Sequence, residues 1–159
     1  MRFVELAALE KASMDFTHQW IISANDLTQT AVATAQSFLV AIPTGANVNE
    51  VELRLIIPFQ NTGDAAFNSD TVSVGDTALA TRWVSAVECN QNGAFITVPQ
   101  FSNTLGGPYA ASQNLVVTVN SMAAKALNNI NRGELHVFVQ LLNPAALSAM
   151  QLATPPSKP

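Results

Sequence analysis

The sequence predicts an all-β protein that folds as an antiparallel sandwich. Three observations lead to this prediction. Apolar and polar residues alternate with a period of two in several short stretches, turn-forming Gly, Pro, Asn and Asp residues separate those stretches, and helical patterns occur only as fragments. The chain has 159 residues. This length corresponds to one domain that can bury a core without disulfides or metals.

The clearest alternating stretch is residues 51–59. Its odd-numbered residues, from Val51 to Phe59, are all apolar, whereas the even-numbered ones include two charged residues. A helix with a period of 3.6 residues would not separate them in this way, so we expect a strand with one face in the core. Pro58 cannot donate a ladder hydrogen bond. We therefore expect the strand either to lie at a sheet edge there or to leave the sheet just before Phe59.

The residues before this strand predict two further strands. Residues 1–15 read as a short helix or an extended arm, and residues 16–22 alternate as a first strand. Ser23 and Asp26 have the spacing of a capping box, so one or two helical turns are expected over 24–30. Residues 36–42 predict the next strand. Because only a short turn follows it, we expect it to pair antiparallel with residues 51–59.

The middle of the chain alternates between turn signals and short strands. Phe67 interrupts a polar loop and is expected to plug an edge of the core. Strands are predicted at 71–74 and 83–89, joined by a crossover at 78–82. The run at 90–93 is a hairpin signal that would pair residues 83–89 with a strand at 94–98.

The last third of the chain contains two more predicted strands. A loop rich in Ser, Asn, Gly and Pro precedes a strand at 115–119. Residues 121–132 predict either a short helix with Ser121 as its cap or an irregular crossover, and the Asn residues favour the crossover. Residues 134–142 are apolar on both faces, which is typical of a central or doubly covered strand. Two helical turns at 145–152 and a Pro-rich end follow. About eight strands with short helical turns favour a jelly-roll-like sandwich at 16–143, with an arm at 1–15 and a tail at 144–159.

The composition favours a protein that binds other proteins. Charged residues make up 11% of the chain, hydrophobic residues 48%, and the formal net charge is -4. Uncharged polar side chains lose water at low cost, which suits a subunit of an assembly; a monomer rich in Ala and Asn is the alternative. The net charge and the scattered basic residues argue against nucleic-acid binding. No signal peptide or membrane span is predicted, and Cys89, a single cysteine, fits a reducing cytoplasm.

Candidates for catalysis or metal binding are few. His18 and His136 lie in predicted strands without a positioned acid or nucleophile, so a structural role is expected for both. With Cys89 they lack the spacing of a zinc site. Asp64, Asp70 and Asp76 lack the dense spacing of a calcium loop and are expected to be solvated loop acids. We therefore expect no enzyme activity and no cofactor, and a hydrolase on a sandwich scaffold is the alternative.

The pattern of residues 72–83 is more specific than these single candidates. In residues 72–83, Gly75 allows a tight bend, Asp76 can accept backbone N–H groups of the following turn, and Arg82 and Trp83 end the crossover, with Trp83 as an anchor under the sheet. Together with residues 53–59 and 133–139, this pattern resembles the capsid cement or decoration proteins of tailed bacteriophages. The resemblance covers roughly residues 20–142. It implies a sandwich on the outer capsid, often a homotrimer, that holds neighbouring major capsid proteins together.

Two classes of function follow as hypotheses. The first is a structural virion protein, made in the host cytoplasm, whose arm and tail bind the major capsid protein. Its expected interface residues are Phe3, Leu6, Leu9, Phe101, Tyr109, Leu147, Met150, Leu152, Pro155 and Pro156. The second is a carbohydrate- or receptor-binding module in which Trp83, Phe101 and Tyr109 form an exposed aromatic platform. A single-jelly-roll capsid subunit is a further alternative.

Overall fold

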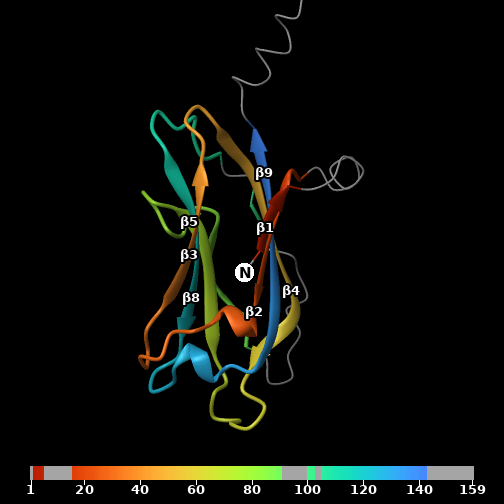
Figure 1. Ribbon diagram of the computed structural model, residues 1–159, viewed down its shortest axis with the longest axis vertical. Helices are drawn as coiled ribbons and strands as arrows, with labels where there is room; N and C mark the ends of the chain where they lie inside the picture. The colour runs from red at the N-terminus through yellow and green to blue at the C-terminus, as the bar shows by residue number, and fades with distance from the viewer. Residues whose placement is uncertain (1, 6–15, 91–99, 103–104, 143–159) are drawn as a thin grey trace, which may run out of the picture.

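The computed structural model describes residues 2–5, 16–90, 100–102 and 105–142, with side chains for all of these except 2–5 and 100–102. The described residues form two antiparallel sheets that pack face to face (Figure 1). The larger sheet has the order β1-β2-β9-β4-β7, and the smaller sheet has the order β3-β8-β5-β6. The strands are β1 (Arg2–Glu5), β2 (His18–Ser23), β3 (Gln36–Ile42), β4 (Asn47–Gln60), β5 (Asp70–Asp76), β6 (Val84–Glu88), β7 (Gln100–Ser102), β8 (Gln113–Ser121) and β9 (Arg132–Leu142).

The strand order is that of a jelly roll. If β1 is set aside, the four strands β2, β9, β4 and β7 face the four strands β3, β8, β5 and β6, which is the double-sheet arrangement of two Greek keys. Helix in the described residues is limited to two 3₁₀ turns, η1 (Ala24–Asp26) and η2 (Leu127–Asn129). The predicted all-β sandwich is therefore confirmed, and its jelly-roll-like form is seen in the strand order.

The core lies between the two sheets. Its largest fully buried side chains are Trp20, Phe59, Phe67, Ile22, Ile42, Leu53, Leu115, Leu127, Leu135, Val48, Val51 and Val72. In β4 the odd-numbered residues Val51, Leu53 and Phe59 are buried in this core and Leu55 packs against it, as the alternation predicts, whereas Ile56 on the opposite face is 50% exposed. Before the register shift between Val48 and Glu50, the buried residue is Val48. Phe67 is buried at the end of the core, so its predicted role as a plug is confirmed.

Strand β4 is longer than the predicted strand and continues through Pro58. Strand β7 pairs with β4 only at Val51–Leu53, so at Pro58 the described partner of β4 is β9 alone. Register shifts on both sides of Ile57 mark irregular pairing with β9 there. The irregular pairing with β9 accommodates a residue that has no N–H group to donate. Strand β4 lies between β9 and β7 in the sheet order and continues to Gln60, so it is neither an edge strand nor a strand that leaves the sheet before Phe59.

The predicted pairing of residues 36–42 with residues 51–59 is wrong. Strand β3 belongs to the smaller sheet and pairs with β8, whereas β4 belongs to the larger sheet and pairs with β9. The short connection between β3 and β4 crosses the core edge instead of forming a hairpin, and its Ala46 is completely buried. The connection forms a corner between the two sheets because this path lets the apolar faces of both strands point into the same core.

The N-terminal residues form an additional strand. Arg2–Glu5 form strand β1, which pairs antiparallel with β2 at the edge of the larger sheet. Of the short helix and the extended arm expected at 1–15, these four residues match the extended one, and residues 6–15 lie outside the described residues. Residues 24–30 give a single 3₁₀ turn, where the Ser23 N–H donates to the Asp26 carboxylate over 2.8 Å. Strand β9 lies between β2 and β4, as predicted for a central strand. The predicted strand at 94–98, its hairpin, and the helical turns at 145–152 lie outside the described residues.

The register places the strand ends at two opposite ends of the sandwich. At one of them, Asn47 pairs with Leu142, Glu5 with His18, and Leu115 with Asp76. We call this the Asp76 end; it carries the β3–β4, β5–β6 and β7–β8 connections, and β9 ends there (Figure 1). At the opposite end, Gln60 pairs with Arg132 and Asp70 with Ser121. We call it the Asp70 end.

Candidate functional site

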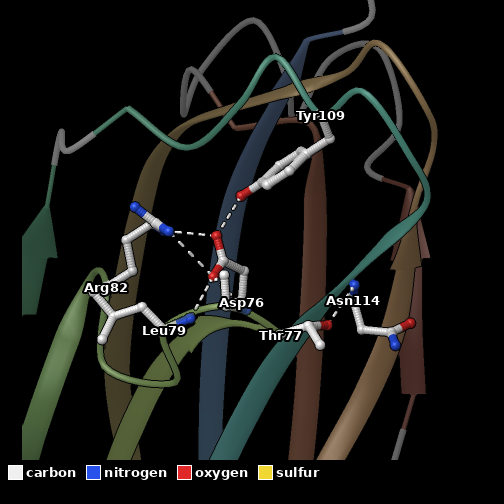
Figure 2. Close-up of polar contacts among 7 residues, drawn as sticks. Asp76, Thr77, Leu79, Arg82, Tyr109 and Asn114 are labelled. Atoms are coloured by element: carbon white, nitrogen blue, oxygen red, sulfur yellow. Dashed lines mark hydrogen bonds and ion pairs between the residues drawn. The ribbon is translucent and has the colours of Figure 1, made fainter.

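The carboxylate of Asp76 is the centre of a hydrogen-bond cluster at the Asp76 end. Its Oδ1 atom accepts the backbone N–H groups of Ala78, at 3.1 Å, and Leu79, at 2.8 Å. Its Oδ2 atom accepts Nε of Arg82 at 2.6 Å and the hydroxyl of Tyr109 at 2.8 Å (Figure 2). The donors come from the β5–β6 connection and from the β7–β8 connection. Asp76 therefore fastens two loops to the end of β5.

The Asp76 carboxylate forms an ion pair with Arg82 although the residue has no exposed surface. Burial alone would raise the pKa of the Asp76 carboxyl, but the hydrogen bonds from Arg82 and Tyr109 outweigh it and hold that pKa below its usual value. Burial, together with the hydrogen bond to Asp76, raises the pKa of the Tyr109 phenol. With donors on both oxygens, this carboxylate acts as a structural crosslink.

Gly75 is required by the path of the loop after β5. A Cβ atom built on Gly75 would lie 2.1 Å from the carbonyl oxygen of Leu79 and 2.3 Å from the carbonyl carbon of Ala80. These are backbone atoms that cannot rotate away. The N–H of Asp76 donates to the carbonyl of Leu79 at 3.0 Å, which closes the turn. The loop therefore folds directly back on the end of β5.

Trp83 anchors the same loop from inside. The residue is 7% exposed, and its backbone N–H donates to the Val74 carbonyl at 3.0 Å. A Cβ atom on Gly106 would lie 2.5 Å from the Trp83 ring and 2.6 Å from the Tyr109 hydroxyl oxygen, so the β7–β8 loop packs against both aromatic groups. Trp83 is thus an anchor, as expected, and its burial removes it from any exposed aromatic platform.

The β3–β4 connection joins the cluster through backbone hydrogen bonds. Val48 and Gly106 exchange two of them, each 2.8 Å long, and the Gly45 N–H donates to the Tyr109 carbonyl at 2.8 Å. On the other side, the Thr77 hydroxyl accepts the Asn114 N–H at 3.1 Å (Figure 2). Three connections at the Asp76 end are therefore held together as one surface.

Exposed apolar side chains also occur at this end. Leu79 is 49% exposed and lies in the β5–β6 loop, and Leu105 is 57% exposed and lies in the β7–β8 loop. Both loops are fixed by Asp76 and Tyr109. Strand β1 ends at Glu5, β2 begins at His18 and β9 ends at Leu142, all at this same end. Segments 6–15 and 143–159 therefore connect to the domain here.

The predicted interface residues are only partly placed. Phe3 lies in β1 and Phe101 in β7, where the backbone alone is described. Leu6, Leu9, Leu147, Met150, Leu152, Pro155 and Pro156 lie outside the described residues. Tyr109 is half-buried, and its hydroxyl is directed at Asp76. Sequence reasoning did not connect Tyr109 with Asp76, because 33 residues separate them and no short motif contains both.

His136 belongs to a polar network on the outer face of the larger sheet. Its Nε2 atom lies 2.7 Å from Glu134 Oε1, and its Nδ1 atom lies 2.9 Å from Gln19 Nε2. The neighbouring Phe138 packs against Phe16, with the Arg54 guanidinium 5.0 Å from the centre of its ring. The His136 contacts are those of a structural residue on a sheet surface.

A second buried carboxyl group lies at the Asp70 end. Asp70 is 1% exposed, and neither of its carboxyl oxygens has a hydrogen-bond partner of normal geometry among the described residues. The neighbouring Glu88 accepts the N–H groups of Asp70, at 2.9 Å, and Asn90, at 2.8 Å. Burial and the charge of Glu88 raise the pKa of Asp70 to about 8, although the Asn90 side chain opposes this shift. The expectation of a solvated Asp70 is wrong, because its strand is buried.

The remaining loop acids and the cysteine differ in their surroundings. Asp64 forms an ion pair with Lys125, and Asp76 is buried in the cluster described above, so only Asp64 is a partly solvated loop acid. In the described parts of the chain, no group of three or more His, Cys, Asp or Glu side chains has a geometry that could hold a metal.

The Cys89 thiol is buried, and burial, with the charges of Asp70 and Glu88, raises its pKa. No helix among the described residues is long and apolar enough to cross a membrane.

One solved structure of a virus is similar to this chain. No protein-family model matches the chain, and no curated protein matches it. Among solved structures, the chain is similar to a chain of the "Cyanophage Pam1 capsid asymmetric unit", with 24% sequence identity and a TM-score of 0.49. The match covers 76% of this chain and 77% of that chain.

Proposed function

We propose that this protein is a structural virion protein that binds the outer surface of a bacteriophage capsid and stabilises contacts between major capsid proteins. In this role it works as a cement or decoration protein, by adding interface and not by catalysis, and it associates with itself as a homotrimer on the particle. The jelly roll supports the proposal, since viral capsid proteins are among the classes of protein that use this fold. The low charge content of the chain also supports it.

The observation that carries the proposal is the construction of the Asp76 end. Three connections are crosslinked there by Asp76, Tyr109 and Gly106, so the surface is ordered before any partner binds. Ordering an interface in advance lowers the entropy cost of association. Leu79 and Leu105 expose apolar surface on the same loops, and segments 6–15 and 143–159 connect there. We therefore assign the Asp76 end as the surface that faces the capsid.

Charge placed at the Asp76 end tests this assignment. Leu79→Lys and Leu105→Lys change side chains that are about half exposed, whereas Ala66→Lys adds the same charge to an exposed residue near the Asp70 end. Particles that lack the protein are incubated with each variant, sedimented, and their occupancy is measured. We expect at least tenfold weaker attachment for the two leucine variants and unchanged attachment for Ala66→Lys. Equal attachment of all three variants would overturn the assignment.

A deletion tests the contribution of the tail. Removal of residues 153–159 leaves every described strand intact, so the domain should keep its unfolding temperature. The deletion removes the contribution of the tail to the binding free energy at each site, and each loss of about 1.4 kcal/mol raises the dissociation constant about tenfold. We expect lower occupancy on particles. Full occupancy after the deletion would show that the tail is not a binding segment.

A single-jelly-roll capsid subunit is the second candidate, and the strand order favours it. A protein of that kind would build the shell itself instead of attaching to one. Electron microscopy of the isolated chain at high concentration separates the two functions. Closed shells without any other protein would favour the subunit, and attachment only to preformed particles would favour the cement protein.

A further inference from the structure

The two sheets present four edge strands in the described structure, namely β1 and β7 in the larger sheet and β3 and β6 in the smaller sheet. An edge strand has unpaired N–H and C=O groups that can pair with another chain, and proteins usually prevent this with short strands, charges, prolines or bulges. The four edges of this protein differ in how far they are protected in these ways.

Three of the four edge strands are short, charged or irregular, which protects them from pairing with another chain. Strand β7 is three residues long, and β1 places Arg2 and Glu5 along its four residues. Strand β6 pairs with β5 through a register shift, and its Ala86 has a φ of 47°, which interrupts a regular edge. None of these three edges offers a long, regular and uncharged row of backbone groups.

Strand β3 is different. Gln36–Ile42 contains no charged residue, no proline and no glycine over its seven residues. All seven pair with β8 in one unbroken register, from Gln36 opposite Val119 to Ile42 opposite Gln113. The opposite edge of β3 has no strand partner among the described residues. Leu39, at the middle of the strand, is 56% exposed on the outer face.

We propose that β3 is a self-association edge, on which β3 of a second copy of this chain pairs antiparallel about a twofold axis at Leu39. The two smaller sheets then form one continuous eight-stranded sheet. This inference does not depend on the proposed capsid function, since it concerns a twofold contact of the isolated protein, whereas the proposed homotrimer forms on the particle.

The sequence of β3 is what selects a second copy as the partner. In a pairing centred on Leu39, Leu39 meets Leu39, Phe38 meets Val40, Ser37 meets Ala41 and Gln36 meets Ile42. No like charges face one another, and apolar cross-strand pairs stabilise a sheet. The outer face of the neighbouring β8 adds no charge, because Asn114, Val116 and Thr118 stand opposite Ala41, Leu39 and Ser37. The strand is therefore complementary to itself, and the exposed Leu39 side chain becomes covered.

Light scattering coupled to size-exclusion chromatography on the full chain tests the proposal. We expect a mass of twice 16.9 kDa, or a multiple of it, at high protein concentration. Leu39→Lys places two like charges opposite each other and should raise the dimer dissociation constant at least tenfold. Ile56→Lys, which changes a half-exposed residue on the outer face of β4 in the other sheet, should leave it unchanged. Circular dichroism confirms that both variants are folded.

Crosslinking provides a second measurement of the same contact. Cross-strand Cβ atoms in an antiparallel pair lie about 4.5–5.5 Å apart, close to the spacing that a disulfide requires. Leu39→Cys should therefore form a covalent dimer under mild oxidation, whereas Ile56→Cys, on the outer face of β4, should not; the native Cys89 is buried. A wild-type chain that stays monomeric, or oligomers that Leu39→Lys does not weaken, would overturn the proposal.

Discussion

The hydroxyl of Tyr109 donates to the Oδ2 atom of Asp76 over 2.8 Å, and this bond joins two loops that lie 33 residues apart in the chain. Arg82 donates to the same oxygen from the opposite side, so the carboxylate is held between a phenol and a guanidinium (Figure 2). Hydrogen bonds to a charged acceptor are stronger than those between neutral groups. The Asp76 end therefore has a rigid centre that does not depend on a partner.

Tyr109→Phe tests the strength of this connection. The substitution keeps the ring and removes the one donor that reaches Asp76 from the β7–β8 loop, while Arg82 and two N–H groups continue to hold the carboxylate. We expect the free energy of unfolding, measured in urea, to fall by about 1.5–3 kcal/mol, as for a hydrogen bond to a charged group. Thr62→Val is the control, because it removes a hydroxyl that accepts a hydrogen bond from the neutral Asn131 side chain at an exposed site near the Asp70 end. If both variants lost the same free energy of unfolding, the hydrogen bond from Tyr109 to Asp76 would be no stronger than an ordinary one.

Gly75→Ala tests the close approach of the loop to β5. The added methyl group would meet backbone atoms of Leu79 and Ala80 at 2.1–2.3 Å, so either the turn or the strand end has to move. We expect thermal unfolding to show a loss of about 2–4 kcal/mol. Gly63→Ala is the matched control, because the nearest heavy atom to its new Cβ is a side-chain oxygen at 3.6 Å. A Gly75→Ala protein as stable as Gly63→Ala would show that the loop does not constrain this position.

The alternation of apolar residues made the fold class predictable, and it located β2, β3, β4, β8 and β9 to within a few residues. It could not assign each strand to a sheet. Strands β3 and β4 both carry one apolar face, and a short connection permits either a hairpin or a corner. The pairing of β3 with β8 and of β4 with β9 distinguishes the two, and the buried Ala46 lies in the resulting corner. The same limit applies to β1, where four residues are too few to show a period.

The candidate site was predictable where its residues are neighbours in the chain. Gly75, Asp76 and Trp83 form a local turn, and local turn chemistry can be read from the sequence. The contacts of Tyr109 and Gly106 with this turn are long-range and carry no motif. The predicted solvent exposure of Asp70 was wrong for a different reason. An acid next to a polar loop suggests exposure, whereas the strand that contains Asp70 is buried.

Acid should weaken the Asp76 cluster. Because hydrogen bonds from Arg82 and Tyr109 outweigh burial, the pKa of Asp76 is lower in the folded chain than in the unfolded chain. The unfolded state therefore binds the proton first, and the stability that Asp76 contributes is complete above the unfolded pKa of about 3.9 and is lost as the pH falls through the folded value. Urea unfolding between pH 5 and pH 2 should show a steeper loss for the wild type than for Asp76→Asn. If the stability of both proteins fell equally with pH, the Asp76 carboxylate would not contribute to the acid sensitivity of the fold.

Asp70 should give the opposite pH dependence. Its folded pKa of about 8 lies above the unfolded value of about 3.9, so between these values the folded chain retains a proton that the unfolded chain releases. Folding stability should therefore fall as the pH rises from about 4 to about 8 and then level off. In Asp70→Asn this decline should disappear. The amide can also donate to the Oδ1 atom of Asn90, which has no partner of normal geometry among the described residues.

Unfolding in urea at pH 5 and pH 8 separates Asp70 from the other acids. At pH 8 we expect Asp70→Asn to be more stable than the wild type by roughly 1–3 kcal/mol, since it avoids a buried charge next to Glu88. Asp64→Asn is the matched control. The hydrogen bond from Lys125 lowers the pKa of Asp64, so this variant should keep the decline between pH 5 and pH 8. If Asp70→Asn were less stable than the wild type at pH 8, the folded chain would have to stabilise the Asp70 carboxylate, and burial could not be what governs its protonation.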